Sequence, residues 1–224
     1  MNPATIFLQA SEVKNIPGIT LKSFIFYILL IAVPGYLFEV LPLPIDTPEL
    51  LIGAIRFSYF ILITYRFKSI RQTIISQLDV RCFKRWRTYF YILISLILPY
   101  AFLHFCLNYG FLLDKKYIFY FKNHMIPATG IGSTINSSIL TPITEEILFR
   151  GILLVFLLKF MKPYLAVGIV TILFSILHPW DIWIFILLSG FLLTITAYKT
   201  KSLLPSMVAH GLWNLYMTQL FLYF

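Results

Sequence analysis

The segment ITEEILFRGI, residues 143–152, places Glu145, Glu146 and Arg150 within six positions of a stretch that is otherwise almost wholly apolar. The whole chain is 59% hydrophobic and only 12% charged. An ionised carboxylate or guanidinium in hydrocarbon costs several kcal/mol unless it is paired, hydrated or moved to the interface. This group of charges therefore indicates an ion pair or a functional site inside a membrane-embedded fold.

The composition supports a membrane protein. The chain has 224 residues, 22 of them Phe, and a formal charge of +9, with a mean hydropathy of +0.85. That hydropathy excludes an ordinary water-soluble domain. The basic residues mostly flank apolar runs, so they indicate membrane topology and lipid contact, and nucleic-acid binding is not expected. Cys82 and Cys106 form no disulfide framework and show no metal-type spacing.

The apolar runs predict an all-α, polytopic helical membrane protein with about seven transmembrane helices in a single domain, residues 1–224. Several runs are shorter than the ~20 residues that cross hydrocarbon, so neighbouring residues must complete them. No cleaved signal peptide is indicated, and the first run is expected to remain a membrane anchor. The runs are Ser23–Val40, Leu50–Tyr65, Tyr89–Leu113, Ile139–Leu158, Tyr164–Leu177, Ile182–Tyr198 and Leu203–Phe224.

The distribution of Lys and Arg predicts a cytoplasmic N-terminus and an external C-terminus. With seven spans, the loops of the far side hold only Lys115, Lys116 and Lys122. The other loop cations gather on the N-terminal side, as the positive-inside rule requires of the cytoplasmic face. The segment Arg66–Arg87 carries apolar residues among its charges and is expected to lie along that face as an amphipathic helix.

Polar residues inside the last four runs occur at helical spacing. Glu146 and Arg150 are four residues apart and are expected to pair on one helix face. Phe174 and His178 have the same spacing in the next run, as do His210 and Asn214 in the last. Each of these pairs therefore projects from a single face.

Glu145 points about 100° away from Glu146 and has no evident partner on its own helix. A carboxylate in an apolar or half-hydrated cavity is suited to general-base catalysis, and an imidazole or amide N–H is suited to stabilising an oxyanion. If the two histidines and Asn214 converge on Glu145, the set suits hydrolysis of a carbonyl compound within the membrane. The alternatives are a structural ion pair, an interfacial His178, and a His210 and Asn214 that only join neighbouring helices.

Three ordered motifs resemble those of a known family. EEILFR (145–150), FSILH (174–178) and HGLWN (210–214) are similar to the EExxxR, FxxxH and HxxxN motifs of the CAAX-protease and bacteriocin-processing (CPBP, or Abi) family of intramembrane peptidases. The resemblance covers about residues 139–217. It implies a CAAX-protease-like helical bundle and an intramembrane endopeptidase that cleaves a small peptide or a membrane-associated protein substrate.

The resemblance also implies residue roles. Glu145 and His178 activate the hydrolytic water, and His210 with Asn214 stabilises the oxyanion. Glu146, Arg150 and Phe174 support them. No cofactor is favoured; if zinc or another divalent metal is present, Glu145, His178 and His210 are the candidate ligands, although no HExxH helix presents two imidazoles together.

The resemblance leaves the substrate open. Short members of the family resemble bacterial proteins that process peptides or confer self-immunity to bacteriocins. We therefore expect a multi-pass protein of a bacterial plasma membrane, and do not expect a prenylated substrate. The alternative function is a non-catalytic immunity or peptide-binding membrane protein. A proton or ion relay is a third, for which runs one, three and six offer only Glu39 near an end.

Four local expectations follow from single residues. Thr141 and Pro142 predict the start of the fourth helix, which puts Glu145 near its outer end. His210 then lies too deep to meet Glu145 unless the connection 198–204 is buried and the sixth span shortened. Asp181 is either an orienting partner of His178 or an interfacial acid. Arg56, in mid-run, is expected to pair or to extend toward the interface.

Overall fold

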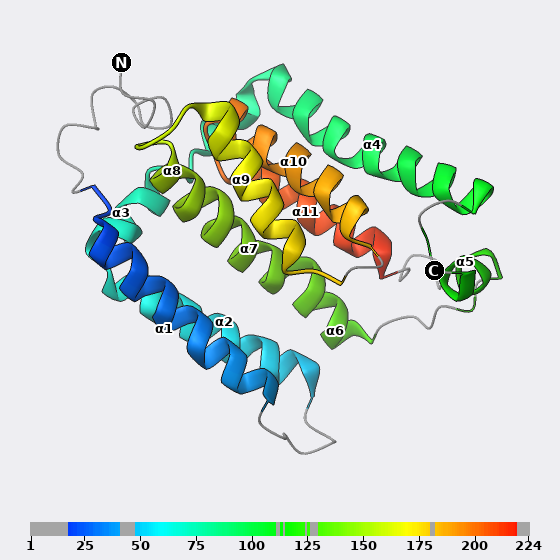
Figure 1. The fold of residues 1–224 in the computed structure, drawn as a ribbon, viewed down its shortest axis with the longest axis horizontal. Helices are drawn as coiled ribbons and strands as arrows, with labels where there is room; N and C mark the ends of the chain where they lie inside the picture. The colour runs from blue at the N-terminus through cyan, green and yellow to red at the C-terminus, as the bar shows by residue number, and fades with distance from the viewer. Residues whose placement is uncertain are drawn as a thin grey trace.

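The computed structural model describes residues 18–40, 48–110, 113, 115–123, 125, 130–179 and 182–218. Within these ranges every regular element is helical, which confirms that the fold is all-α (Figure 1). The elements are α1 (Leu21–Val40), α2 (Glu49–Arg66), α3 (Lys68–Ile75), the 3₁₀ helix η3 (Val80–Lys84), α4 (Trp86–Tyr109), α5 (Lys115–Lys122), α6 (Ile131–Ile135), the π-helix η4 (Asn136–Leu140), α7 (Thr141–Glu146), the π-helix η5 (Ile147–Leu153), α8 (Leu154–Leu157), α9 (Pro163–Ile176), α10 (Trp183–Thr200) and α11 (Leu204–Met217).

Each predicted apolar run contains a helix, but the count of seven crossings is not confirmed. Among the described residues, α4 and α10 are long and apolar enough to cross a membrane. A third candidate is α2 taken together with residues 68–84, with a bend of 106° between them. Residues 21–36 and 163–176 form shorter apolar helices.

The helix that carries Glu145 is longer than the sequence predicted. Elements α6 to α8 form one unbroken helix from Ile131 to Leu157, with Gly130 at its N-cap. The expectation that Thr141 and Pro142 start this helix is therefore wrong, and Glu145 lies near its middle. The reason is the π-helix η4, which allows a proline inside a helix by widening the turn before it.

The hydrogen bonds around Pro142 show how this works. In η4 the Thr141 N–H donates to the Asn136 carbonyl, five residues back. The next bond in that register would join residue 142 to the Ser137 carbonyl, but proline has no N–H. The Asn214 side-chain amide of α11 donates to that carbonyl instead, at 2.8 Å. A helix interruption in the sequence thus becomes a contact point between two helices.

The central helices of the bundle are α10 and α11. α10 contacts α9, α4 and α11, and α11 also packs on η4 and α7. The pair α1 and α2 lies along the other side of the α6–α8 helix (Figure 1). Apolar residues from α8 and α9 form one buried cluster, which includes Leu154, Val170 and Phe174.

The connection between α10 and α11 is buried in part: Lys201 is exposed, whereas Ser202 and Leu203 are buried as expected. Ser202 is 1% and Leu203 0% exposed. The Leu203 N–H donates to the backbone carbonyl of Gln77 at 2.9 Å, and the fully buried Gln77 amide donates to the Gly151 carbonyl at 2.9 Å. α10 is not shortened, however: it has 18 residues, Trp183–Thr200.

The predicted amphipathic segment 66–87 forms two short helices rather than one. α3 buries Ile70 and Ile74, whereas Ile75 and Val80 are exposed. The 3₁₀ helix η3 follows after a turn, and Asp79 caps it by accepting from the Arg81 N–H at 3.0 Å. Whether this segment lies along a membrane surface stays a prediction.

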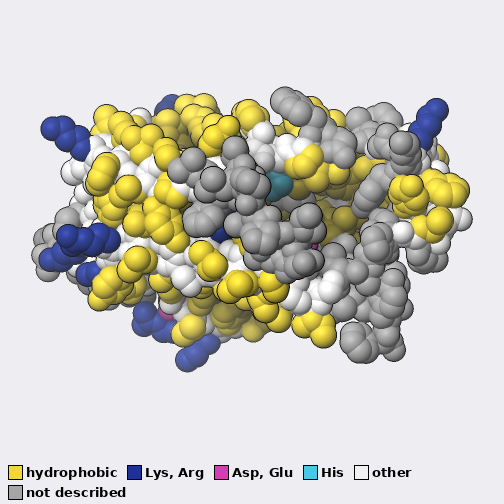
Figure 2. Space-filling view, turned by 90° about the horizontal axis from the view of Figure 1, so that it is seen from below, with side chains coloured by type: hydrophobic (Ala, Val, Ile, Leu, Met, Phe, Trp, Pro, Cys, Tyr) yellow, Lys and Arg dark blue, Asp and Glu magenta, His cyan; other side chains and the backbone are white. Residues whose placement is uncertain are grey.

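The surface of the bundle is largely apolar. Figure 2 shows hydrophobic side chains over much of one face, with most of the Lys and Arg visible there toward one end. A histidine and an acidic side chain are visible near the middle of the same face. A broad apolar surface with cations at the end is typical of a protein embedded in lipid.

Candidate active site

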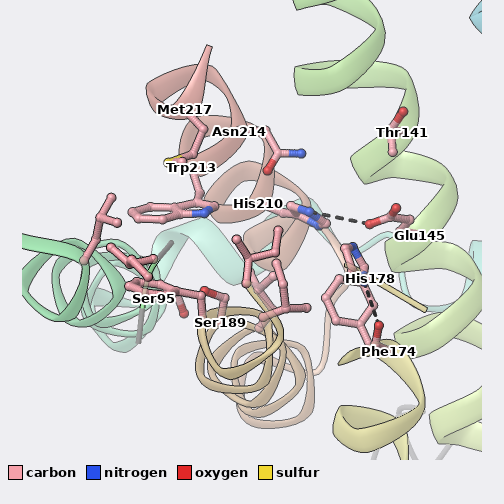
Figure 3. Close-up of a pocket in the computed structure, with 16 residues that line it drawn as sticks. Ser95, Thr141, Glu145, Phe174, His178, Ser189, His210, Trp213, Asn214 and Met217 are labelled. Carbon is pink, nitrogen blue, oxygen red and sulfur yellow. Dashed lines mark hydrogen bonds and ion pairs between the residues drawn. The ribbon is translucent and has the colours of Figure 1, made fainter. Parts of the chain in front are cut away.

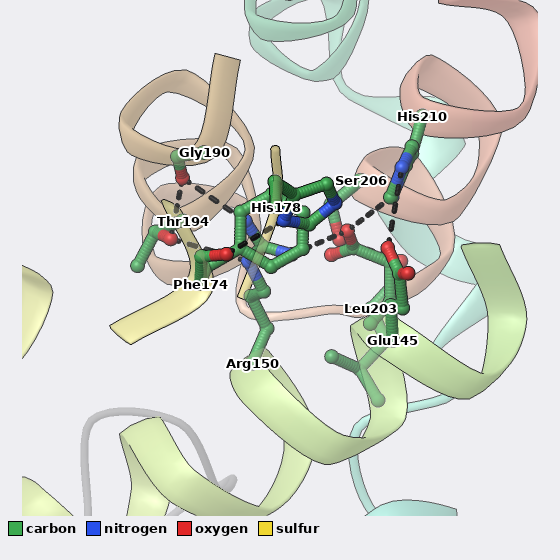
Figure 4. Close-up of polar contacts among 10 residues, drawn as sticks. Glu145, Arg150, Phe174, His178, Gly190, Thr194, Leu203, Ser206 and His210 are labelled. Atoms are coloured by element: carbon green, nitrogen blue, oxygen red, sulfur yellow. Dashed lines mark hydrogen bonds and ion pairs between the residues drawn. The ribbon is translucent and has the colours of Figure 1, made fainter. Parts of the chain in front are cut away.

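A buried ion pair anchors the site. Arg150 donates to Glu146 at 2.8 Å, and both side chains are fully buried, which confirms the predicted pair. Arg150 also donates to the Gly190 carbonyl at 3.1 Å and the Thr194 hydroxyl at 3.2 Å, both on α10. Its guanidinium lies 4.2 Å from the centre of the Phe174 ring. The pair therefore joins three helices as well as neutralising two charges (Figure 4).

Glu146 has a second partner that the sequence did not reveal. Its Oε1 atom, which accepts from Arg150, also lies 2.9 Å from Nδ1 of His210. Because a carboxylate bound to arginine only accepts, His210 must donate from Nδ1. Its other nitrogen, Nε2, lies 3.6 Å from Oε2 of Glu145. Glu146 thus fixes which edge of the His210 ring faces Glu145.

His178 is oriented in a similar way by the backbone. Its Nδ1 lies 2.7 Å from the Phe174 carbonyl. A carbonyl can only accept, so Nδ1 carries the proton, and in the neutral ring Nε2 is left with a lone pair. Phe174 also packs against both imidazoles, with ring centroids 4.7 Å from His178 and 6.0 Å from His210.

One cavity of about 310 Å³ is lined by all four residues that the sequence proposed as catalytic, Glu145, His178, His210 and Asn214. Figure 3 shows Glu145 on one helix facing His210 and His178, with Asn214 above them. Most of the remaining lining is apolar and comes from α4, α9, α10 and α11. Its members are Ser95, Leu103, Leu113, Thr141, Phe174, Ile182, Phe185, Ile186, Ser189, Leu193, Trp213 and Met217.

His210 was expected to lie too deep in the bundle to meet Glu145, but the two side chains meet for two reasons. Glu145 lies near the middle of the Ile131–Leu157 helix rather than in its first turn. α9 has 14 residues, so it is about 21 Å long at 1.5 Å per residue. This is less than the ~30 Å thickness of the hydrocarbon layer, so His178, just beyond α9, does not reach the far side. The three side chains therefore meet inside the bundle rather than at its surface.

The Asn214 amide contributes one N–H to the Ser137 carbonyl, at 2.8 Å. An amide nitrogen carries two donors, so its second N–H is available to another acceptor in the cavity. Trp213, on the same helix, also lines the cavity. Asp181 lies outside the described residues.

Two glycines that support the site could not have been identified from the sequence. A Cβ on Gly190 would lie 2.8 Å from the Phe174 ring, so glycine there lets Phe174 reach the site. A Cβ on Gly211 would lie 2.6 Å from the Ser138 carbonyl, so glycine there lets α11 approach η4. Neither close approach has a signal in the local pattern.

Glu145, His178 and His210 are the candidate metal ligands. In the part of the chain that the structure describes, no three His, Cys, Asp or Glu side chains form a group that could hold a metal ion. Glu145, His178 and His210 line the same cavity but do not form such a group.

One family model matches the part of the chain that holds this site. Residues 127–216 match a family model described as Rce1-like, type II CAAX prenyl endopeptidase. No curated protein and no solved structure matches the chain. The matched segment contains all three motifs and every residue of the proposed catalytic set. Residues 127–216 of the chain are therefore similar to a family of CAAX prenyl endopeptidases, in agreement with the resemblance of the three motifs.

Proposed function

We propose that the protein is an intramembrane endopeptidase that hydrolyses a peptide bond in a small peptide or a membrane-associated substrate. The observation that carries the proposal is the single cavity lined by Glu145, His178, His210 and Asn214. Its walls are otherwise mostly apolar, which suits hydrophobic substrate side chains and keeps bulk water from the reacting groups.

The reaction begins with a water molecule between Glu145 and His178. Glu145 takes a proton from the water as its oxygen attacks the carbonyl carbon, while Nε2 of His178, which can accept, helps to orient the water. The resulting tetrahedral intermediate carries the negative charge on the former carbonyl oxygen. The C–N bond then breaks, and the proton held by Glu145 passes to the leaving amine.

Two donors from α11 stabilise the oxyanion in this scheme. The second N–H of the Asn214 amide is one of them. The other is Nε2–H of His210, which donates only when the ring is doubly protonated, because Nδ1–H is already directed at Glu146. The mechanism needs no metal, and Glu146 and Arg150 hold His210 in place.

The decisive experiment compares purified protein and the Glu145→Gln variant in lipid nanodiscs. The probes are hydrophobic peptides with and without a prenylated cysteine, with products identified by mass spectrometry. We expect the wild type to cleave a peptide, and Glu145→Gln to lower the rate by about 100- to 10,000-fold, the range for loss of a general base. Binding of the same peptides to both proteins is measured in parallel.

Two results would contradict the proposal. One is cleavage by Glu145→Gln at the wild-type rate. The other is peptide binding by both proteins without any product from either, which would identify a non-catalytic binding or immunity protein.

A further inference from the structure

Glu145 borders a second, smaller pocket on its other side. This pocket has a volume of about 190 Å³ and lies between α2 and the Ile131–Leu157 helix. It shares Thr141 and Glu145 with the larger cavity, and the Glu145 side chain is 24% exposed. The carboxylate therefore stands at the boundary of two compartments.

The two compartments differ in chemistry. The larger cavity is walled mainly by aliphatic and aromatic side chains. The smaller pocket is more open and carries a guanidinium, an amide, two hydroxyls and the Glu145 carboxylate in its lining. Its members are Gly53, Arg56, Phe57, Asn136, Leu140, Thr141, Thr144 and Glu145.

Arg56 brings a positive charge into the lining of this pocket. Small and polar residues such as Gly53 and Asn136 are common where membrane helices touch. A Cβ on Gly53 would overlap the Asn136 side chain, so this contact is indeed close. Arg56 is the eighth of the 18 residues of α2, so its side chain starts near the middle of that helix. At that depth a cation marks a polar pathway or a water-filled cavity.

The pocket is also small for a substrate. Sites for drug-sized ligands begin at about 300 Å³, well above the volume found here. A peptide anion is disfavoured as well, because the Glu145 carboxylate forms part of the wall. Water can hydrogen-bond to hydroxyls, amides and charged groups alike, and it is the small molecule that a hydrolase must supply to its base.

We propose that this pocket is a water compartment of the protein, and that Glu145 draws the hydrolytic water from it while the substrate occupies the larger apolar cavity. The role of this water in hydrolysis rests on the proposed function. The presence of water in the pocket does not depend on it. Water enters through the smaller pocket, and the substrate occupies the larger cavity. Bulk water therefore stays out of the apolar cavity, and only a water molecule that passes Glu145 reaches it.

Cysteine labelling tests the hydration of the pocket directly. Thr144→Cys places a thiol in the pocket, and Ile139→Cys places one on the exposed apolar side of the same helix. The probe is a charged methanethiosulfonate reagent applied to protein in liposomes, with the unsubstituted chain, whose Cys82 and Cys106 are buried, as the background. We expect Thr144→Cys to react about tenfold faster or more, because only an ionised thiol reacts and hydrocarbon suppresses ionisation.

Two further variants sharpen the result. Ser189→Cys in the larger cavity should react as slowly as Ile139→Cys if that cavity is kept dry. Phe57→Cys reports on the pocket from α2, should Thr144→Cys fail to fold. Equal rates at the pocket and at position 139 would overturn the proposal. So would protection of Thr144→Cys by a bound peptide, because the pocket would then hold substrate.

Turnover of the labelled protein tests whether Glu145 draws its water from the smaller pocket. Thr144→Cys carrying the bulky reagent should lose turnover and keep its peptide affinity. If unlabelled protein cleaves no peptide, the proposed function fails while the labelling result still decides hydration. If the labelled protein cleaves at the unlabelled rate, water reaches Glu145 by another route and the inference is wrong.

Discussion

At the scale of single residues, one oxygen atom decides how the site is organised. Oε1 of Glu146 accepts from Arg150 at 2.8 Å and lies 2.9 Å from Nδ1 of His210. The two adjacent glutamates therefore have separate functions: Glu146 positions a histidine, and Glu145 faces the cavity. This division could be anticipated only in part from the sequence, because the i,i+4 spacing predicts the arginine partner but not the histidine 64 positions away.

Removing one member of the buried pair should be costly. Arg150→Met leaves the Glu146 carboxylate buried without its cation, and we expect a loss of about 3–5 kcal/mol in the free energy of unfolding. The measurement is reversible unfolding in detergent, with Glu145→Gln as the control that leaves this pair intact.

The double variant Glu146→Gln, Arg150→Met separates charge from packing in the same measurement. It should regain part of the lost stability, because no unpaired charge remains. A double variant that is less stable than Arg150→Met alone would show that the cost comes from packing.

At the scale of elements, close contacts between helices bring the catalytic groups together. α11 reaches η4 because position 211 has no side chain, and the Asn214 amide then takes over the Ser137 carbonyl that Pro142 leaves without a donor. The π-helix, the proline and the glycine thus act together, although they belong to segments about 70 residues apart.

Gly211→Ala should separate α11 from η4. Its Cβ would meet the Ser138 carbonyl, a backbone atom that cannot rotate away. We expect a loss of about 1–3 kcal/mol in stability, the usual cost of overpacking, and a fall in turnover, since His210 moves with the helix. Thermal unfolding and peptide cleavage measure the two effects.

Gly168→Ala on α9 is the matched control, because a Cβ there meets nothing within 4 Å. It should raise stability slightly, by about 0.5–1 kcal/mol, the helix preference of alanine over glycine. Wild-type turnover in Gly211→Ala would show that the close approach of α11 is not needed for the site.

The cap of η3 gives a prediction with a pH dependence. The hydrogen bond from the Arg81 side chain lowers the pKa of Asp79 below its ordinary value of 3.8. The capping charge therefore stabilises the fold above pH 3.8, and this contribution is lost as the pH falls through the lower pKa of the folded state. Because the site is exposed, Asp79→Ala should cost about 0.5 kcal/mol, the low end of the N-cap range.

Unfolding of the wild type and of Asp79→Ala is compared at pH 7 and in acid. The difference in stability should shrink toward zero once the wild-type carboxyl is protonated. A difference that stays constant over this range would mean that the carboxylate charge has no part in the cap.

At the scale of the whole molecule, the orientation in the membrane stays a prediction. The Lys and Arg bias places the N-terminus in the cytoplasm, and seven crossings place the C-terminus outside. Alkaline phosphatase, which folds only outside the cytoplasm, should be active when fused after residue 224 and inactive when fused after residue 85. The reverse pattern, or equal activity at both positions, would overturn either the orientation or the odd number of crossings.

The sequence by itself determined the helical fold class, the resemblance to a family of proteases and the choice of candidate site residues. These follow from local information: long apolar runs, and polar groups at helical spacing that are too costly to leave in lipid without a purpose. The Glu146–Arg150 pair belongs here as well, because its members are neighbours on one helix.

Only the tertiary structure decided how deep each group lies and what it contacts. The start of the α6–α8 helix at Ile131, the His210 bond to Glu146 and the second pocket beside Glu145 all depend on helices packing against each other. Pro142 does not start the helix, contrary to the prediction from the sequence. It has no N–H to donate to the Ser137 carbonyl, and the Asn214 side chain of a distant helix donates to that carbonyl instead. Such compensation joins residues that are remote along the chain, so local sequence patterns carry no trace of it.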